Sequence, residues 1–423
     1  MKKTFYIFLL VMMGMNLTAQ SVWDGKREAI INGSGTENDP YLIENAQNLA
    51  WLIYTINWDY AAWTEGKYFL LTTDIDLNGN ADNQWIPIGA GVSNSGKKAF
   101  NGVFDGGFHK ITGIYIDDNN EINKPESLWK QSNAAFFSQL DNNTQVKNLY
   151  IEGYIVNTKT AAGFSGKSGN FEYCISNVDV ETISNNVGGI ASTGSITVKN
   201  SANIADIKGN NGVGGIVGFN GNIENCYNTG RVEGADFVGG IAGKATSIAN
   251  SYNVGDVVCA DGANNKGGIA GKVNTNVNCY YLESCIAESN NYGEPMTAEF
   301  MRSQEFVNLL NNNTNVWVAD SENTNDGYPV FGDSHFDVFE NFVDNTDLVV
   351  LYPNPTTDYI HIIGDVTSYE IYDLVGKCVC KNIRLNVSST IEEIHVSDLQ
   401  SGIYMIRLFV HDGNVVTKKF IKQ

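Results

Sequence analysis

The sequence predicts an all-β protein: a right-handed parallel β-helix (β-solenoid) with short capping helices, followed by a small C-terminal Ig-like β-sandwich. Three observations support this fold class. A glycine-rich phrase recurs about every 26 residues, as "VGGIAS", "VGGIVG", "VGGIAG" and "KGGIAG" from Val187, Val213, Val238 and Lys266. The short segments that follow these phrases align in columns of small and apolar residues. From residue 347 the repeat gives way to evenly spaced, alternating strands.

The aligned columns define one structural repeat, which we call a rung. One column holds Leu149, Cys174, Ser201, Cys226, Ser251 and Cys279. Six residues later a second column holds Ile155, Val180, Ile207, Val232, Val257 and Cys285. Three residues before the first column lie Val146, Phe171, Val198, Ile223 and Ile248. We expect all three columns to face the interior, because a single rung is too small to bury a core and must stack on its neighbours.

Two polar columns precede the first inward column. The nearer one holds Asn148, Tyr173, Asn200, Asn225, Asn250 and Asn278. Stacked asparagines can hydrogen-bond to each other along the axis, so this column predicts an amide ladder. One residue before the asparagines lies a column that alternates in charge, with Lys147, Glu172, Lys199 and Glu224 on successive rungs. Such a row predicts exposed ion pairs, each worth about 0–1 kcal/mol.

The seven cysteines are expected to be free thiols. Cys174, Cys226 and Cys279 share a column but are separated by Ser201 and Ser251. Strands stack at about 4.8 Å, so two rungs span more than the ~7 Å between Cα atoms that a disulfide tolerates. Buried thiols of this kind act as small apolar side chains.

The chain divides into segments of different character. Residues 1–19 predict a signal peptide cleaved between Ala19 and Gln20, because a basic start precedes a short apolar run. The segments that follow are an N-terminal cap with the first strands (20–110), the solenoid rungs (111–290), a C-terminal cap (291–333), a linker (334–346) and the C-terminal domain (347–423). No other run is apolar and long enough to predict a membrane-spanning helix in the mature protein.

Helices are expected at both ends of the solenoid. "NAQNLAWLIYTIN" has apolar residues at helical spacing, and Asn45 can cap its start. "PMTAEFMRSQEFVNLLN" is a second amphipathic segment after the last rung. Solenoids need their open ends covered, so both helices are expected to flank or cap the stack. Tryptophans of the N-terminal region are expected in the core of its cap: Trp51, Trp58, Trp63 and Trp85.

Composition and motifs exclude several kinds of site. The formal net charge of −20 argues against nucleic acid as a partner, since phosphates need a basic surface. "AAGFSGKS" resembles a phosphate-binding loop but begins with Ala161 where glycine is required. The histidines are scattered and no CxxC pair occurs, so we expect no zinc site, cofactor or catalytic metal. Whether calcium binds near Asp74 and Asp76 stays open, because their loop lacks the glutamate that completes a calcium-binding loop.

The C-terminal segment resembles the C-terminal sorting domain of type IX (Por) secretion cargo. The matching residues are Tyr352, Pro353, Asn354 and Pro355 of "YPNP", Gly376 of "YDLVGK", Gly402 and Tyr404 of "SGIYMIRL", and Lys418 and Lys419 near the end. The resemblance covers residues 347–423. It implies the type IX secretion machinery as a partner, and export across both membranes to the cell surface or the extracellular space.

The rungs resemble the GLUG repeats of bacterial surface proteins, as in "VGGIVG…IENCYNTGRVEG". With the flanking phrases "GSGTENDPYLIENAQNLAWL" and "NDGYPVFG", this resemblance covers roughly residues 30–333. The repeat is informative about fold more than activity. Some proteins with this repeat are IgA-cleaving metallopeptidases, but their HExxH motif does not occur here, so that activity is not expected.

Two functions remain open from the sequence. Tyr227, Tyr252 and Tyr280 directly follow the inward column on three consecutive rungs. They predict an outward aromatic strip for a glycan or protein ligand, unless they only stack on one another. The predicted function is therefore non-catalytic adhesion or ligand binding. The alternative is a carbohydrate-active β-helix enzyme, a polysaccharide lyase or glycoside hydrolase, although only Arg231 and Asp256 share a turn region and no cluster of acids is evident.

Overall fold

The structure is a computed structural model. It describes residues 20–59, 61–90, 99–117, 133–157, 159–312, 314–332, 350–352, 356–363, 366–373, 377–382, 391–410 and 415–422. The chain separates into two compact units after Val338, within the range predicted as a linker. The predicted signal peptide with Ala19, and the linker 334–346, lie outside the described residues.

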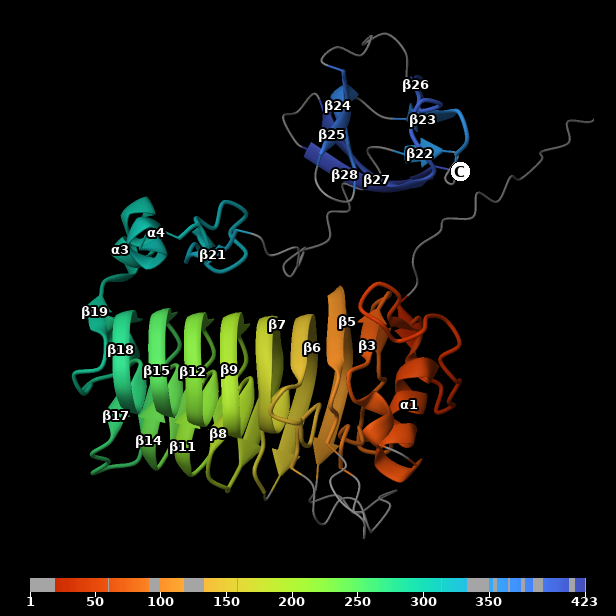
Figure 1. Cartoon of the computed structure of the whole chain (residues 1–423). Coiled ribbons are helices and arrows are strands. Elements are labelled where there is room, and N and C mark those ends of the chain that lie inside the picture. Colours follow the sequence, from red (N-terminus) through yellow and green to blue (C-terminus); the bar gives the residue numbers. More distant parts are fainter. Residues whose placement is uncertain are drawn as a thin grey trace, which may run out of the picture. The chain divides into compact units, whose positions relative to one another are not determined.

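The N-terminal region begins with short strands around one helix. The strands are β1 (Ser21–Val22), β2 (Tyr41–Ile43), β3 (Tyr68–Leu71) and β4 (Ile75–Asp76); the helix α1 (Ala46–Tyr54) continues into a π-helical turn (Thr55–Asp59) and a 3-10 turn (Ala61–Thr64). The Asn45 side chain accepts a hydrogen bond from the Asn48 N–H at 2.7 Å and so caps α1, as predicted. Leu49 and Leu52 of this helix are fully buried, which places its apolar face against the first rungs (Figure 1).

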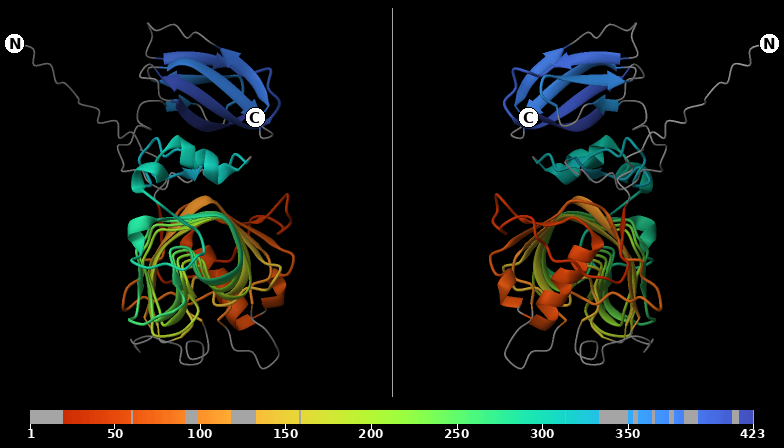
Figure 2. Two further views of the ribbon diagram at one scale, coloured as in Figure 1. Left: turned by 90° about the vertical axis from the view of Figure 1, so that its left-hand side faces the viewer. Right: turned by 90° about the vertical axis from the view of Figure 1, so that its right-hand side faces the viewer.

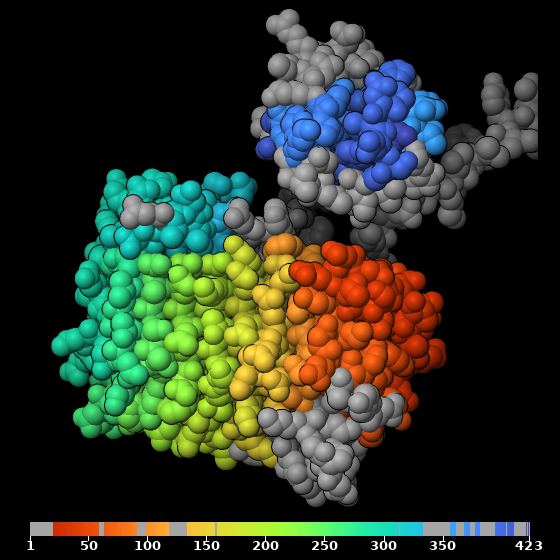
Figure 3. Space-filling view, in the orientation of Figure 1, coloured from red at the N-terminus to blue at the C-terminus, as the bar shows by residue number. Residues whose placement is uncertain are grey.

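The rungs form a parallel β-solenoid, which confirms the predicted architecture. The long strands stack in chain order: β5 (Val103–Asp117), β6 (Gln145–Asn157), β7 (Ser165–Thr182), β9 (Ala191–Asn203), β12 (Val217–Asn228), β15 (Ala242–Asn253) and β18 (Ala270–Leu282). A second stack holds β8 (Val187–Gly188), β11 (Asn211–Gly214), β14 (Asp236–Gly239) and β17 (Lys266–Gly267), and a third short row holds β10 (Ile207–Lys208), β13 (Val232–Gly234) and β16 (Val257–Cys259). Successive rungs lie over one another when the stack is seen along its axis (Figure 2) and form adjoining bands of side chains (Figure 3). The handedness stays a prediction.

The predicted columns match the observed register. Leu149 pairs with Cys174, and Ser251 pairs with Cys279, in parallel neighbouring strands. The second column is equally regular, because Ile207 pairs with both Val180 and Val232. No residue of the three predicted inward columns is more than 6% exposed. The alternation of the strands therefore predicted correctly which side chains build the core.

A buried asparagine ladder explains the second glycine of the phrases that start at Val187, Val213 and Val238. Asn203, Asn228 and Asn253 are fully buried, and along the axis Asn203 Nδ2 donates to Asn228 Oδ1 and Asn228 Nδ2 donates to Asn253 Oδ1, each at 2.8 Å. A β-carbon on Gly215 or Gly240 would overlap the asparagine side chain beside it. Only glycine leaves room for these amides, so the glycine phrases serve packing. This ladder was not predicted from the sequence, although its asparagines recur three residues after the predicted asparagine column of Asn200, Asn225 and Asn250.

The predicted outer asparagine ladder is present between particular pairs of rungs. Asn225 Nδ2 donates to Asn200 Oδ1 at 2.9 Å, and Asn278 Nδ2 donates to Asn250 Oδ1 at the same distance. These four residues have φ values of 47–55°, in the left-handed region that asparagine tolerates better than most residues. In the neighbouring charged column, Lys199 Nζ lies 3.1 Å from Glu224 Oε2, as the alternating charges predicted.

All cysteines of the described residues are free thiols, as expected. Cys174 and Cys226 are fully buried, and their backbone N–H groups donate to the hydroxyls of Ser201 and Ser251 on the next rung, each at 3.0 Å. Burial raises the pKa of Cys226 from 9.0 to about 12 and that of Cys279 to about 11. The thiols thus behave as small neutral core groups.

These raised pKa values predict a loss of stability in alkali. The unfolded chain releases a proton from Cys226 near pH 9.0, whereas the folded chain keeps it until about pH 12, so the stabilisation is complete below pH 9.0 and is lost as the pH rises. Ser201 and Ser251 already occupy the same column, and Cys226→Ser removes the thiol that ionises. Between pH 8 and pH 10, we expect the free energy of unfolding to fall by about 1 kcal/mol less in the variant than in the natural chain. Denaturation curves at several pH values measure the difference, and parallel losses in both proteins would contradict it.

The C-terminal cap follows the last rung. It contains a 3-10 turn (Glu283–Cys285), β19 (Glu294–Met296), α3 (Ala298–Met301), α4 (Gln304–Asn311), β20 (Trp317–Val318) and β21 (Val330–Phe331). β19 pairs in parallel with β18 and so covers part of the end of the stack. Thr297 and Ser303 cap the two helices, each hydroxyl accepting a backbone N–H at 3.2 Å.

The second unit contains two antiparallel sheets. One sheet holds β22 (Val350–Tyr352), β23 (Tyr359–Ile363) and β26 (Ile391–His395); the other holds β25 (Cys378–Asn382), β24 (Val366–Asp373), β27 (Gly402–Val410) and β28 (Val415–Lys422). Ile360 and Ile394 of the first sheet share a core with Ile371, Ile406 and Phe420 of the second. The two sheets therefore pack face to face, as a small sandwich requires.

The predicted sorting residues fall on several strands of this unit. Tyr352 lies in β22, Gly402 and Tyr404 lie in β27, and Lys418 and Lys419 lie in β28. The Tyr404 hydroxyl donates to the Gln400 carbonyl at 2.9 Å, and its side chain is buried. Pro353, Asn354, Pro355 and Gly376 lie outside the described residues.

Candidate functional site

The predicted tyrosine strip is not an open surface. Tyr227, Tyr252 and Tyr280 do share one column on adjacent rungs, as the register shows. Their exposed fractions, however, are 2%, 0% and 6%. The expectation of an exposed aromatic strip is therefore wrong. The side chains point away from the interior of the solenoid but lie beneath the C-terminal cap.

The cap covers the side of the stack as well as its end. Tyr227 and Tyr252 stack with ring centroids 5.3 Å apart, and Trp317 of β20 lies 5.4 Å from Tyr252. The Tyr252 hydroxyl donates to the Pro329 carbonyl at 2.6 Å, and Asn325 Nδ2 donates to the same hydroxyl at 2.8 Å. Burial raises the pKa of Tyr252 well above its ordinary range. Covering large aromatic rings removes much apolar area from water, which explains why the cap lies here (Figure 1).

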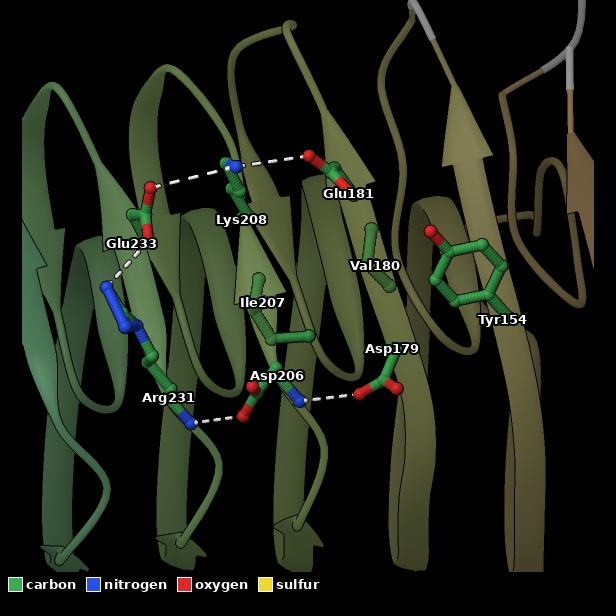
Figure 4. Close-up of a pocket in the computed structure, with 9 residues that line it drawn as sticks. All are labelled: Tyr154, Asp179, Val180, Glu181, Asp206, Ile207, Lys208, Arg231 and Glu233. Atoms are coloured by element: carbon green, nitrogen blue, oxygen red, sulfur yellow. Dashed lines mark hydrogen bonds and ion pairs between the residues drawn. The ribbon is translucent and has the colours of Figure 1, made fainter. Parts of the chain in front are cut away.

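A different face of the solenoid carries an open pocket, which we call the charged groove. It has a volume of about 230 Å³ and crosses successive rungs. Its lining residues are Tyr154, Asp179, Val180, Glu181, Asp206, Ile207, Lys208, Arg231 and Glu233 (Figure 4). Val180 and Ile207 belong to the buried second column, so the polar residues are those immediately before and after it in each strand.

The residues before the inward column form one row of the groove. Asp179 Oδ1 accepts the backbone N–H of Asp206 at 3.0 Å. Asp206 Oδ1 in turn accepts the backbone N–H of Arg231 at 2.8 Å. Each aspartate thus binds the rung that follows it (Figure 4). The row presents two carboxylates at equivalent positions of neighbouring rungs, about 4.8 Å apart along the stack.

The residues after the inward column form a second row, in which the charges alternate from rung to rung. Lys208 Nζ lies between Glu181 Oε1 at 3.1 Å and Glu233 Oε1 at 3.8 Å. Arg231, from the first row, reaches Glu233 Oε2 at 2.8 Å. The hydrogen bond that Lys208 donates to Glu181, together with the charges of both glutamates, raises the pKa of Lys208. These side chains are about half exposed, so the row offers both donors and acceptors to solvent.

Aromatic side chains border the groove at its N-terminal side. Tyr154 is 39% exposed, and its ring centroid lies 6.2 Å from that of Tyr115 on the preceding rung. Partial burial, with the nearby charge of Glu181, raises the pKa of Tyr154, so the phenol stays neutral. An exposed ring beside fixed hydrogen-bonding groups can bind a ligand that has both an apolar face and hydroxyls.

Of the polar side chains that line this groove, only Arg231 was singled out from the sequence. It was paired with Asp256, and no cluster of acids was evident, whereas the structure brings Arg231 to Asp206 and Glu233. The sequence pattern that could have predicted the groove is the set of polar residues on either side of the second inward column. Its preceding residues are Tyr154, Asp179, Asp206 and Arg231, and its following residues are Glu181, Lys208 and Glu233.

The loop considered for calcium uses its carboxylates within the protein. Asp74 Oδ1 lies 3.0 Å from His109 Nδ1 and accepts the Lys110 N–H at 3.0 Å. Burial works to raise the pKa of Asp74, but these hydrogen bonds lower it overall. Asp76 Oδ1 accepts the Asn78 N–H at 2.7 Å, which closes the turn. Within the described ranges, no three His, Cys, Asp or Glu side chains gather as a metal-ligand set.

Two segments of the chain match family models. Residues 350–423 match the secretion system C-terminal sorting domain, and residues 209–233 match the GLUG motif. The second match contains Arg231 and Glu233 of the charged groove. The sorting domain marks proteins that the type IX system exports to the cell surface or the extracellular space. Among the described residues, no helix has the length and apolar character needed to cross a membrane.

Similar proteins share part of this chain. It is 31% identical over 180 residues to a protein of Evansella cellulosilytica assigned as a Gly-rich membrane protein, and 25% identical over 195 residues to halomucin of Haloquadratum walsbyi. These alignments cover 41% and 45% of this chain but only 18% and 2% of the two relatives. The chain thus spans less than a fifth of the length of either relative. A solved chain from Bacteroides ovatus, assigned as an immunoglobulin A1 protease, has a TM-score of 0.49 and 22% identity, over 71% of this chain and 94% of its own.

Proposed function

We propose that this exported solenoid, which carries a GLUG motif and a type IX secretion sorting domain, is a non-catalytic ligand-binding protein of the adhesion type. Its charged groove would hold an extended glycan. The single observation that carries the proposal is the groove itself, where exposed Tyr154 borders two rows of polar side chains that continue across successive rungs.

The chemistry of the groove supports a saccharide ligand. A sugar ring has an apolar C–H face, which can lie on Tyr154, and hydroxyls, which can bond to the carboxylates and cations beside it. The lining holds four carboxylates and two cations, a net charge of −2, so the groove favours a neutral saccharide over an acidic one. Because the rows repeat along the axis, a chain of sugars can make many weak contacts that add up.

A carbohydrate-active enzyme is the second candidate. Asp179 and Asp206 stand on adjacent rungs at a spacing close to the ~5 Å between the carboxylates of retaining glycosidases. Both, however, use one oxygen to bind a backbone N–H and thereby hold the rungs together. The two candidates differ in a measurable product: only an enzyme releases shortened saccharides.

The test combines glycan-array binding with a screen for saccharide products, using the full chain and two variants. Tyr154→Ala removes the exposed ring, and we expect about tenfold weaker binding to the glycans that the natural chain selects. Val277→Ala is the matched control, because Val277 is 55% exposed on another part of the stack. Its binding should equal that of the natural chain.

Two results would decide against the proposal. The first is a saccharide product that disappears in Asp206→Asn, which would establish the enzyme instead. The second is glycan binding that Tyr154→Ala leaves unchanged, since the ligand would then lie elsewhere. Thermal melts of each variant separate a loss of binding from a loss of fold.

A further inference from the structure

A second pocket lies in the N-terminal cap, far in sequence from the charged groove. It has a volume of about 190 Å³ and an aromatic lining. The residues around it are Trp23, Gly25, Arg27, Ala50, Ile53, Tyr54, Trp58, Trp85 and Ile86. We call it the N-terminal pocket. Its volume is below that of pockets for drug-sized ligands, which suits a single ring.

The wall formed by residues 23–27 is held in place by several hydrogen bonds. The Trp23 N–H donates to the Asp76 carbonyl at 2.8 Å, and its indole Nε1 donates to the Lys26 carbonyl at 2.9 Å. Asp24 accepts from Lys26 Nζ at 2.8 Å and from Gln47 Nε2 of α1 at 2.9 Å. The segment is therefore joined both to β4 and to α1, which gives the pocket a preformed shape.

Arg27 is the charged group of this pocket. Its guanidinium carbon lies 3.7 Å from the centroid of the Tyr54 ring, in a stacked cation–π arrangement. It forms no ion pair with any residue that the structure describes, whereas the neighbouring Lys26 and Asp24 pair with each other. Stacking on Tyr54 orients the planar guanidinium, so its N–H groups are ready to bind a carboxylate with two bonds.

Trp58 is the exposed aromatic surface. Its side chain is 38% exposed, so the expectation that it belongs to the core is wrong, although Trp85 is buried at 3% and stacks on Phe136. Trp58 stacks on Tyr54 with centroids 5.3 Å apart and an angle of 17°. It stands in the π-helical turn after α1, a local geometry that is frequent at functional sites.

We infer that the N-terminal pocket binds one sugar residue that bears a carboxylate, such as a uronic acid unit of a glycan. The apolar face of its ring would lie on Trp58, and its carboxylate would accept two hydrogen bonds from Arg27. The net charge of −20 does not oppose this, because salt at physiological strength screens charges beyond about 8 Å. The site is separate from the charged groove and does not depend on the function proposed for it.

The test measures the binding of trigalacturonate and of its fully methyl-esterified form to the full chain by calorimetry. The two probes share their rings and differ in the carboxylate charge. We expect the acid form to bind at least about tenfold more tightly. Arg27→Gln should abolish that preference, while Trp58→Ala should weaken the binding of both probes. Lys272→Gln is the charge-matched control: it removes one positive charge from an exposed lysine of β18 and should bind like the natural chain.

The outcomes separate this inference from the function proposed for the groove. Tyr154→Ala should leave uronate binding unchanged, and Arg27→Gln should leave the glycan selected by the groove unchanged. Equal binding of the acid and the ester would overturn the inference, as would a preference that survives in Arg27→Gln. Binding of a peptide with a C-terminal carboxylate in the same pocket, without any uronate binding, would also overturn it. Thermal melts of Trp58→Ala confirm that the cap stays folded.

Discussion

Replacing Ile223 with aspartate is expected to lower the free energy of unfolding by about 3–5 kcal/mol, the cost of an uncompensated buried charge. Ile223 is 2% exposed and pairs with Val198 and Ile248 on the rungs before and after it. No group of opposite charge belongs to these inward columns, so the carboxylate must either stay unpaired or open the rung. Because each rung is stabilised by its neighbours, damage in the middle of the stack should spread to both sides.

The adjacent residue provides the control. The Glu224 side chain is 44% exposed and pairs with Lys199 at 3.1 Å, so Glu224→Ala should cost no more than about 1 kcal/mol. Urea denaturation followed by circular dichroism compares the two variants, and limited proteolysis shows whether the middle rungs open first. Equal destabilisation by both changes would mean that the inward and outward positions have been assigned wrongly.

Removing residues 347–423 is expected to keep the protein in the periplasm. The deletion removes the sorting domain, and with it the contact to the type IX machinery on which surface delivery depends. The solenoid itself should stay folded, because it forms a compact unit without these residues. Cell fractionation and protease treatment of whole cells locate the truncated chain.

A reporter fusion provides the matching positive test. An unrelated periplasmic protein that carries residues 347–423 at its C-terminus should reach the cell surface, whereas the reporter alone should not. Normal surface display of the truncated chain would contradict the expected role of the domain. Such display would also follow if the solenoid itself were recognised for export, so the truncated chain and the fusion protein together identify the signal.

The register of the solenoid was predictable because each rung repeats the same local constraints. A residue at an inward position, such as Val232, has apolar residues at the same position of the rungs on both sides, so its column is visible in the sequence. Asn225 and Cys226 were placed correctly for the same reason. The buried ladder of Asn228 was equally periodic, but nothing in a single sequence distinguishes a polar residue that faces the core from one that faces water.

The sequence by itself therefore determined the solenoid, its register and the sorting domain, because these depend on repetition and on local motifs. Only the tertiary structure decided which outward faces are open. Tyr252 points away from its own strand's core, but Trp317, 65 positions further along the chain, covers it. Asp206, Lys208 and Arg231 form one groove because stacking brings different rungs together. Alternation shows on which side of a strand a residue lies, whereas the segment that covers that side depends on contacts between distant parts of the chain.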